Sequence, residues 1–156
     1  MSASMPRWRR AGAEPPLLAV DSRLFVYHFE GHELFGEPAG RILAAAEEGR
    51  CRLVTSVVAL LEVLVVPKRL GRTDLADRYR EFFHSFPNLT VVAVDAEIAE
   101  RAAALRAEHS LRTPDALHLA TAETSGAAQF VSEDRRLARV EAVAVTSTSA
   151  TATALW

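Results

Sequence analysis

Residues 17–29 read LLAVDSRLFVYHF, and this stretch decides the fold. Its first four residues are apolar, and the run stops at Asp21, as is typical of a short strand buried inside a parallel sheet. The segment after Asp21 has the apolar spacing of a helix. A buried strand that leads directly into a helix predicts a parallel sheet covered by helices, with Asp21 at the carboxyl end of the first strand.

The rest of the chain repeats this alternation of strands and helices. Further strands are expected over residues 51–56, 89–94, 128–132 and 141–147. Helices are expected over 37–49, 57–67, 73–86, 96–110 and 113–126, with a short one over 134–140. The boundaries rest on Gly49 and Gly126 as stops, on Pro67 as a helix end, and on Thr73, Asp95 and Thr113 as caps. The pattern predicts an α/β fold of three layers, a parallel five-stranded sheet with helices on both faces.

Length and composition indicate one domain in a cytoplasmic protein. The 156 residues suffice for a single core, which we place at 17–147, after a flexible leader at 1–16 and before a Ser/Thr-rich tail at 148–156. The longest apolar run, 57–66, is too short to cross a bilayer, and the lone Cys51 fits a reducing compartment. Because the net charge is −2, a polyanionic partner must be held by a local patch.

Four carboxylates stand out by their context. Asp21 ends the first strand, Glu62 interrupts an apolar helix, Asp115 opens a helix and Asp134 follows the fourth strand. Each also has a structural explanation, because three of them suit helix caps or first turns and Glu62 suits a polar stripe. If they converge at the carboxyl edge of the sheet, their repulsion calls for a cation, and oxygen ligands favour Mg²⁺ or Mn²⁺ over zinc.

Four stretches of the chain resemble, in order, the motifs of the PIN-domain metal-dependent ribonucleases and of VapC-type toxins among them. They are LLAVDSRLFVYHFE (17–30), TSVVALLEVLV (55–65), LRTPDALHLATA (111–122) and FVSEDRRLARV (130–140). The resemblance implies a PIN-like fold and a metal-dependent endoribonuclease that uses Mg²⁺, with Mn²⁺ able to substitute. It places the metal-binding and catalytic acids on Asp21, Glu62, Asp115 and Asp134. It also implies an RNA substrate, a VapB-like antitoxin as partner and a homodimer, with no membrane association.

Several residues near these motifs have two interpretations. Ser132 and Glu133 depart from the family pattern, and Glu133 adds a charge beside the site. His118 lies three residues after Asp115 and either packs beside the site, orients that carboxylate or contacts a phosphate. A set of arginines forms either a basic rim for RNA or a solvated surface: Arg69, Arg72, Arg78, Arg80, Arg135, Arg136 and Arg139.

Three other functions compete with a toxin ribonuclease. One is a PIN fold that serves only as a binding or scaffold domain, and another is a different metal-dependent phosphoesterase such as a DNA nuclease. A receiver-like signalling module fits poorly, because the first strand is not followed by an adjacent acidic pair and the fifth does not end in lysine.

Overall fold

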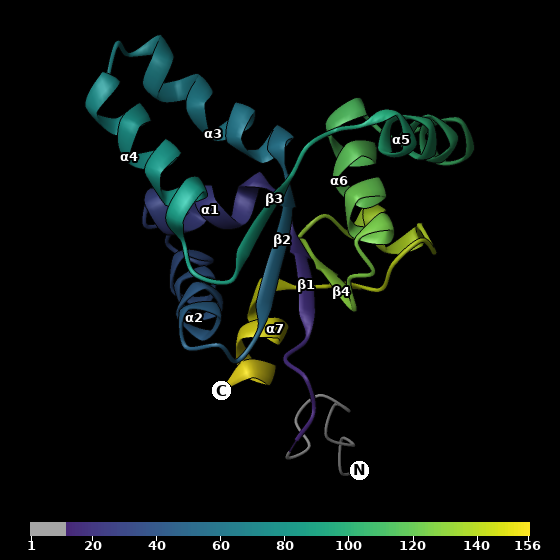
Figure 1. Cartoon of the computed structure of the whole chain (residues 1–156), viewed down its shortest axis with the longest axis horizontal. Coiled ribbons are helices and arrows are strands. Elements are labelled where there is room, and N and C mark those ends of the chain that lie inside the picture. Colours follow the sequence, from purple (N-terminus) through teal and green to yellow (C-terminus); the bar gives the residue numbers. More distant parts are fainter. Residues whose placement is uncertain (1–11) are drawn as a thin grey trace.

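The computed structural model describes residues 12–156, so most of the expected leader lies outside the described part. A parallel five-stranded sheet stands between two groups of helices (Figure 1). The strands are β1 (Leu17–Val20), β2 (Arg52–Ser56), β3 (Leu89–Val92), β4 (Gln129–Val131) and β5 (Val145–Thr146). The helices are α1 (Ser22–Phe29), α2 (Gly36–Glu47), α3 (Val57–Arg69), α4 (Thr73–Ser85), α5 (Ala96–His109), α6 (Thr113–Thr124), the 3₁₀ turn η2 (Arg135–Arg139) and α7 (Thr148–Leu155).

The strand order is β3-β2-β1-β4-β5, which puts β1 in the centre of the sheet. The register pairs Ala19 with Val54 on one side and with Phe130 on the other. From β1 the chain first builds the sheet towards β3 and later, from β4, in the opposite direction. Ligand sites of open parallel sheets lie at the carboxyl ends of the strands where this order reverses. Here that point lies between β1 and β4, the strands that precede Asp21 and Asp134.

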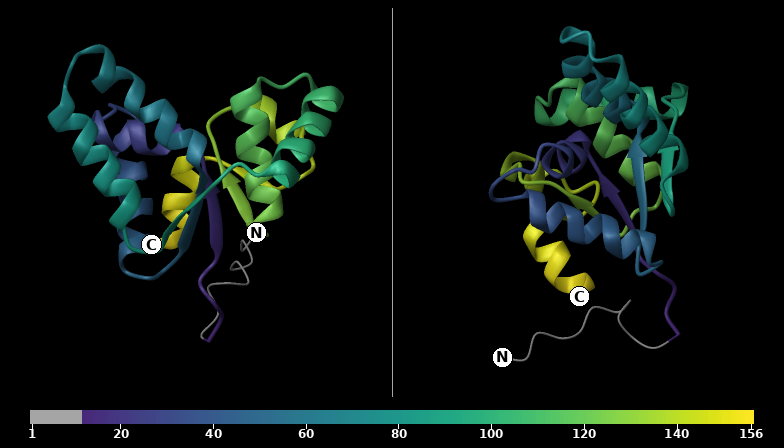
Figure 2. Two further views of the ribbon diagram at one scale, coloured as in Figure 1. Left: turned by 45° about the horizontal axis from the view of Figure 1, so that its top comes forward. Right: turned by 90° about the vertical axis from the view of Figure 1, so that its left-hand side faces the viewer.

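Alternating strand residues separate two cores, as expected for a sheet covered on both faces. Leu18, Val20 and Leu53 contribute to the core that the sheet shares with α1, α2, α3 and α7. Ala19 and Phe130 contribute to the other core, beneath α5, α6 and η2. The two groups of helices diverge above the sheet, so α3 with α4 and α5 with α6 flank its upper edge (Figure 2).

The predicted helix boundaries are confirmed at several positions and wrong at three. Gly49 and Gly126 close α2 and α6 with positive φ angles of 76° and 69°, and the Asp95 side chain caps α5. Thr73 and Thr113 are not caps, because each is already helical and Arg72 and Arg112 precede them as N-caps. The Thr113 hydroxyl instead accepts a hydrogen bond from Arg106 at 3.0 Å.

Pro67 does not end α3, which continues to Arg69. A proline lacks an N–H group, so it removes one bond of the helical ladder but leaves its own carbonyl as an acceptor. That carbonyl accepts from the N–H of Arg72 at 2.9 Å, across Gly71, whose φ of 64° makes the turn. The end of α3 is therefore set by Gly71.

The Ser/Thr-rich segment at 148–156, for which the sequence predicts no element, contains α7. Its first N–H, that of Thr148, donates to the Glu133 carboxylate at 2.6 Å. At the other end the Trp156 indole donates to the carbonyl of Arg41 at 3.1 Å, and the Arg50 guanidinium lies 4.1 Å from the indole ring centre. The carboxyl-terminal helix thus packs against α2 and is bonded to the loop after β4.

No helix within residues 12–156 has the length and apolar character needed to span a membrane.

Candidate metal centre

Asp21 lies at the carboxyl end of the central strand and is 6% exposed. One carboxylate oxygen accepts from the N–H of Arg23 at 3.0 Å, so Asp21 also caps α1. The strand end is fixed by Thr55, whose hydroxyl donates to the carbonyl of Val20 at 2.7 Å. Burial raises the pKa of Asp21 to about 6, although the nearby His118 and Arg23 oppose this rise. The structure therefore keeps a carboxylate whose negative charge is incompletely neutralised.

Glu62 is held near Asp21 by side-chain hydrogen bonds. Its Oε1 lies 2.8 Å from Nε2 of His118, a residue of α6 that is almost completely buried. Ser22, the first residue of α1, also hydrogen-bonds to the Glu62 carboxylate. Burial by itself raises the pKa of Glu62, but these hydrogen bonds outweigh it and leave the pKa below its ordinary value. His118 thus contacts Glu62 rather than Asp115, the carboxylate that the sequence suggested.

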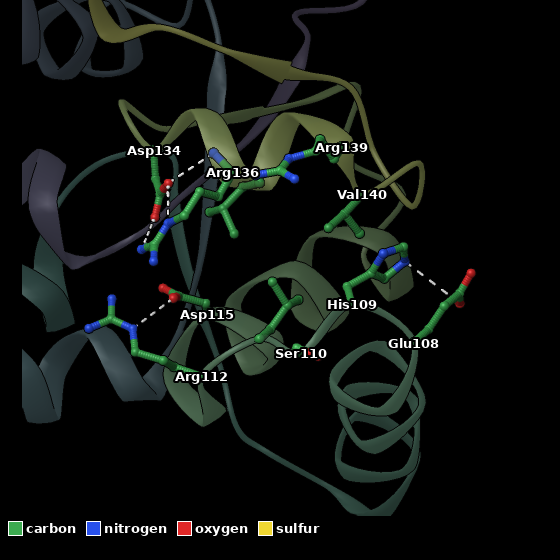
Figure 3. Close-up of a pocket in the computed structure, with 11 residues that line it drawn as sticks. Glu108, His109, Ser110, Arg112, Asp115, Asp134, Arg136, Arg139 and Val140 are labelled. Carbon is green, nitrogen blue, oxygen red and sulfur yellow. Dashed lines mark hydrogen bonds and ion pairs between the residues drawn. The ribbon is translucent and has the colours of Figure 1, made fainter.

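Asp115 and Asp134 line one pocket of about 360 Å³ between α6, η2 and the end of α5 (Figure 3). Asp115 lies in the first turn of α6 and accepts from Nε of Arg112 at 3.1 Å. Asp134 caps η2 and accepts from Nε and Nη2 of Arg136 at 3.0 and 2.8 Å. The guanidinium of Arg136 holds the pKa of Asp134 down at about 2.

Two arginines interact electrostatically with more than one of the four carboxylates. Arg23 lowers the pKa of Asp21, of Glu62 and of Asp134, and Arg136 interacts with Asp115 as well as with Asp134. Within residues 12–156, however, no three His, Cys, Asp or Glu side chains are grouped closely enough to hold a metal ion. The predicted acids therefore gather at one edge of the sheet as two pairs, and arginines bind one pair.

The donor set fits a hard divalent cation. All four acids offer carboxylate oxygens, the ligands that Mg²⁺ and Mn²⁺ prefer. The buried carboxylate of Asp21, with its pKa of about 6, lacks the full counter-charge that such an ion would supply. Asp115 and Asp134 have arginine counter-charges instead, at 3.1 and 2.8 Å. The metal itself stays a prediction.

The other residues noted in the sequence have separate places. Glu133 bonds to the start of α7, which accounts for its charge without a ligand role. Arg136 and Arg139 line the pocket of Asp115 and Asp134, whereas Arg135 lines a different one. Arg72 and Arg80 pair with acids of their own helix, Asp74 and Asp77. Of the two interpretations offered by the sequence, a solvated and salt-bridged surface describes Arg72 and Arg80, and Arg136 and Arg139 line the pocket.

Sequence reasoning missed Arg23 and Arg112. Both lie within three residues of a predicted ligand, Arg23 two positions after Asp21 and Arg112 three before Asp115. An arginine three residues from an acid at a helix start is a recognisable ion-pair spacing, so Arg112 had a local signal. Arg23 had none beyond its closeness in sequence.

The fold and the site define an α/β domain with two carboxylate pairs at the reversal point of a parallel sheet. Residues 18–143 match the model of the PIN domain. The chain therefore belongs to the PIN domain family, which confirms the resemblance seen in the sequence. No curated protein sequence matches the chain.

Solved structures share this fold at low sequence identity. A chain of a toxin–antitoxin complex from Klebsiella pneumoniae has a TM-score of 0.64 and 23% identity, covering 84% of this chain and 97% of that one. VapBC2 from Rickettsia felis, bound to a promoter DNA fragment, has a TM-score of 0.67 and 15% identity, covering 84% of this chain and 98% of that one. VapC20 from Mycobacterium tuberculosis, a sarcin–ricin loop cleaving toxin, has a TM-score of 0.60 and 19% identity, covering 72% of this chain and 86% of that one.

Proposed function

We propose that this chain is a divalent-metal-dependent endoribonuclease and the toxin of a toxin–antitoxin pair. The observation that carries the proposal is the buried Asp21, placed beside Glu62 at the reversal point of a PIN-domain sheet. Burial of a charged carboxylate at that point costs stability, and a bound cation would neutralise the charge. A structural neighbour described as an RNA-cleaving toxin supports RNA as the substrate.

In this proposal a bound ion draws the two pairs together: Asp21, Glu62 and Asp115 hold it, and Asp134 completes the site or supports a second one. A bound Mg²⁺ or Mn²⁺ would supply a water of lowered pKa and neutralise charge on the phosphate. Neighbouring residues of the chain orient two of these carboxylates. The imidazole of His118 and the hydroxyl of Ser22 hold the Glu62 carboxylate, and the N–H of Arg23 fixes the orientation of Asp21.

The partner is proposed to be a VapB-like antitoxin, bound to a toxin homodimer. Two of the structural neighbours are VapBC or toxin–antitoxin complexes. The exposed apolar side chains of α3, Leu61, Val65 and Val66, offer a surface for a protein partner. Co-purification from the native host tests this point, and recovery of the chain without any small partner would count against it.

The test of the activity is cleavage of total RNA and of transfer RNA by antitoxin-free protein. We expect cleavage with Mg²⁺ or Mn²⁺, none with EDTA, and none from Asp115→Asn with either ion. Asp95→Asn is the control for the loss of a carboxylate at a helix start, because Asp95 caps α5 and asparagine is an equally good cap.

Three results would contradict the proposal. Cleavage by Asp115→Asn at the wild-type rate would exclude the metal assignment. A folded wild-type protein that binds Mn²⁺ but cleaves only DNA would be a DNA nuclease, and one that binds no metal and cleaves nothing would be a scaffold domain.

A further inference from the structure

The arginines of the Asp115–Asp134 pocket lie on the solvent side of the acids that they bind. The side chains of Asp115 and Asp134 are 14% and 8% exposed, whereas those of Arg112 and Arg136 are both 64% exposed. Each guanidinium, drawn with its acid in Figure 3, is therefore the exposed partner of a mostly buried carboxylate. A cation that arrives from solvent must displace these guanidinium groups to reach the two carboxylates.

The bonds that hold the arginines are weak enough to exchange. In each of these pairs the arginine is exposed, and water solvates a released guanidinium well, which lowers the free energy that the pair contributes. The remaining contacts of Asp134 come from the N–H of Arg136 and do not depend on its guanidinium. Asp134 can thus keep its backbone position while the Arg136 side chain swings away.

Displacement would leave the pocket with positive charge. Arg112, Arg136 and Arg139 line it together with Asp115, Asp134 and a single further acid, Glu108. Once a divalent ion neutralises the two aspartates, three guanidinium groups face one carboxylate across about 360 Å³. Planar guanidinium groups bind phosphate oxygens in pairs, and such a pocket has room for a phosphate and its sugar.

We propose that Arg112 and Arg136 are exchangeable counter-ions. Without metal they neutralise Asp115 and Asp134, and when a divalent ion takes these carboxylates they bind a backbone phosphate of single-stranded RNA in the same pocket. The proposal rests on the proposed function for its RNA substrate. Its first half, the competition with metal, stands on the ion pairs alone.

The competition is tested by calorimetric titration of antitoxin-free protein with Mn²⁺. Arg136→Gln removes one competitor and is expected to bind Mn²⁺ roughly two- to fivefold more tightly than wild type, in line with the strength of an exposed ion pair. Arg112→Gln should act in the same direction, and the double variant should exceed either. Arg135→Gln is the matched control, because it removes an equal charge from the neighbouring residue, whereas the ion pairs of the two aspartates are made by Arg112 and Arg136.

The phosphate half is tested by the kinetics of RNA cleavage at saturating Mn²⁺. We expect Arg136→Gln to raise KM for a short single-stranded RNA roughly tenfold, by analogy with the loss of one phosphate contact. The Mn²⁺ concentration for half-maximal rate should fall in the same variant. A residue that merely supported Asp134 would move both quantities upwards.

The outcomes separate the inference from the proposed function. Mn²⁺ affinity of Arg136→Gln that is weaker than wild type, or no tighter than that of Arg135→Gln, overturns the exchange even if the wild type cleaves RNA. An unchanged KM overturns the phosphate half. The wild type and the variants can also all fail to cleave RNA. Mn²⁺ binding that is then tighter in Arg136→Gln than in the wild type would support the exchange, while the ribonuclease assignment fails.

Discussion

The two carboxylate pairs at the edge of the sheet solve one electrostatic problem in opposite ways. Asp21 and Glu62 are held by backbone N–H, hydroxyl and imidazole groups, and burial raises the pKa of Asp21 to about 6. Asp115 and Asp134 are held by guanidinium groups, and the pKa of Asp134 falls to about 2. Asp21 is buried and Asp134 is only half-buried, so depth of burial and counter-charge together decide the direction of each shift.

The difference teaches that, without a metal, Asp21 is the carboxylate of the four whose pKa is raised for lack of a full counter-charge. Charge on Asp21 weakens the fold, as expected of a group kept for function rather than stability. Charge on Asp134 is already compensated within the chain. Four changes test this contrast, beginning with the one that should have the largest effect.

Asp21→Asn should stabilise the protein at pH 7.5 by about 3 kcal/mol, since the pKa rises by about two units on folding. A pKa raised in the folded state favours the protonated form. The cost of ionising Asp21 is therefore absent below pH 3.8, grows as the pH rises to about 6 and is complete above it. Asparagine keeps the helix cap. Urea unfolding from pH 4 to 8 measures the gap between wild type and variant, and a gap that does not widen with pH would refute the strained carboxylate.

His118→Leu should lower the free energy of unfolding by about 1–2 kcal/mol, because the Glu62 carboxylate loses a hydrogen bond that is shielded from water. His118→Gln supplies an amide N–H in place of Nε2 and should recover most of the loss. Equal losses in the two variants would mean that the imidazole ring matters only for packing. The comparison is made by urea unfolding at pH 7.5.

Glu133→Ala should cost about 1 kcal/mol, because α7 loses an acceptor for its first N–H and a negative charge at its positive end. This loss of stability concerns the loop that carries Asp134, because Glu133 is the residue before it, and leaves the Asp21–Glu62 pair untouched. Glu141→Ala, an exposed acid in the next loop, serves as the control for lost charge. Similar unfolding midpoints in the two variants would show that Glu133 does not hold α7.

Arg136→Gln should have the smallest effect on stability, because its ion pair lies at the surface. It should raise the pKa of Asp134 from about 2 towards its ordinary value, and carboxyl NMR titration can follow that change. A pKa lowered on folding stabilises the protein above pH 3.8, and this contribution is lost as the pH falls to about 2. An unmoved pKa would assign the shift to the N–H of residue 136 instead.

Local signals in the sequence predicted the fold well, and contacts between distant residues explain what they missed. The apolar run before Asp21 and the glycines after α2 and α6 act within a few residues, so their effects were readable. The sequence offered packing, Asp115 or a phosphate as contacts of His118, but its partner Glu62 comes from another helix. Glu133 was a charge without a role until α7 supplied the N–H of Thr148. Neither pairing leaves a trace in residue spacing.

The central position of β1 also has a consequence for synthesis. Val20 pairs with Val131, so the middle of the sheet joins the first part of the chain to the last. This pairing forms late during synthesis, because β4 emerges from the ribosome long after β1. Asp115 and Asp134 reach Asp21 only after residue 134 has been translated. A nascent chain that stops before β4 therefore lacks the assembled set of four acids, and any activity that needs all four begins after that point.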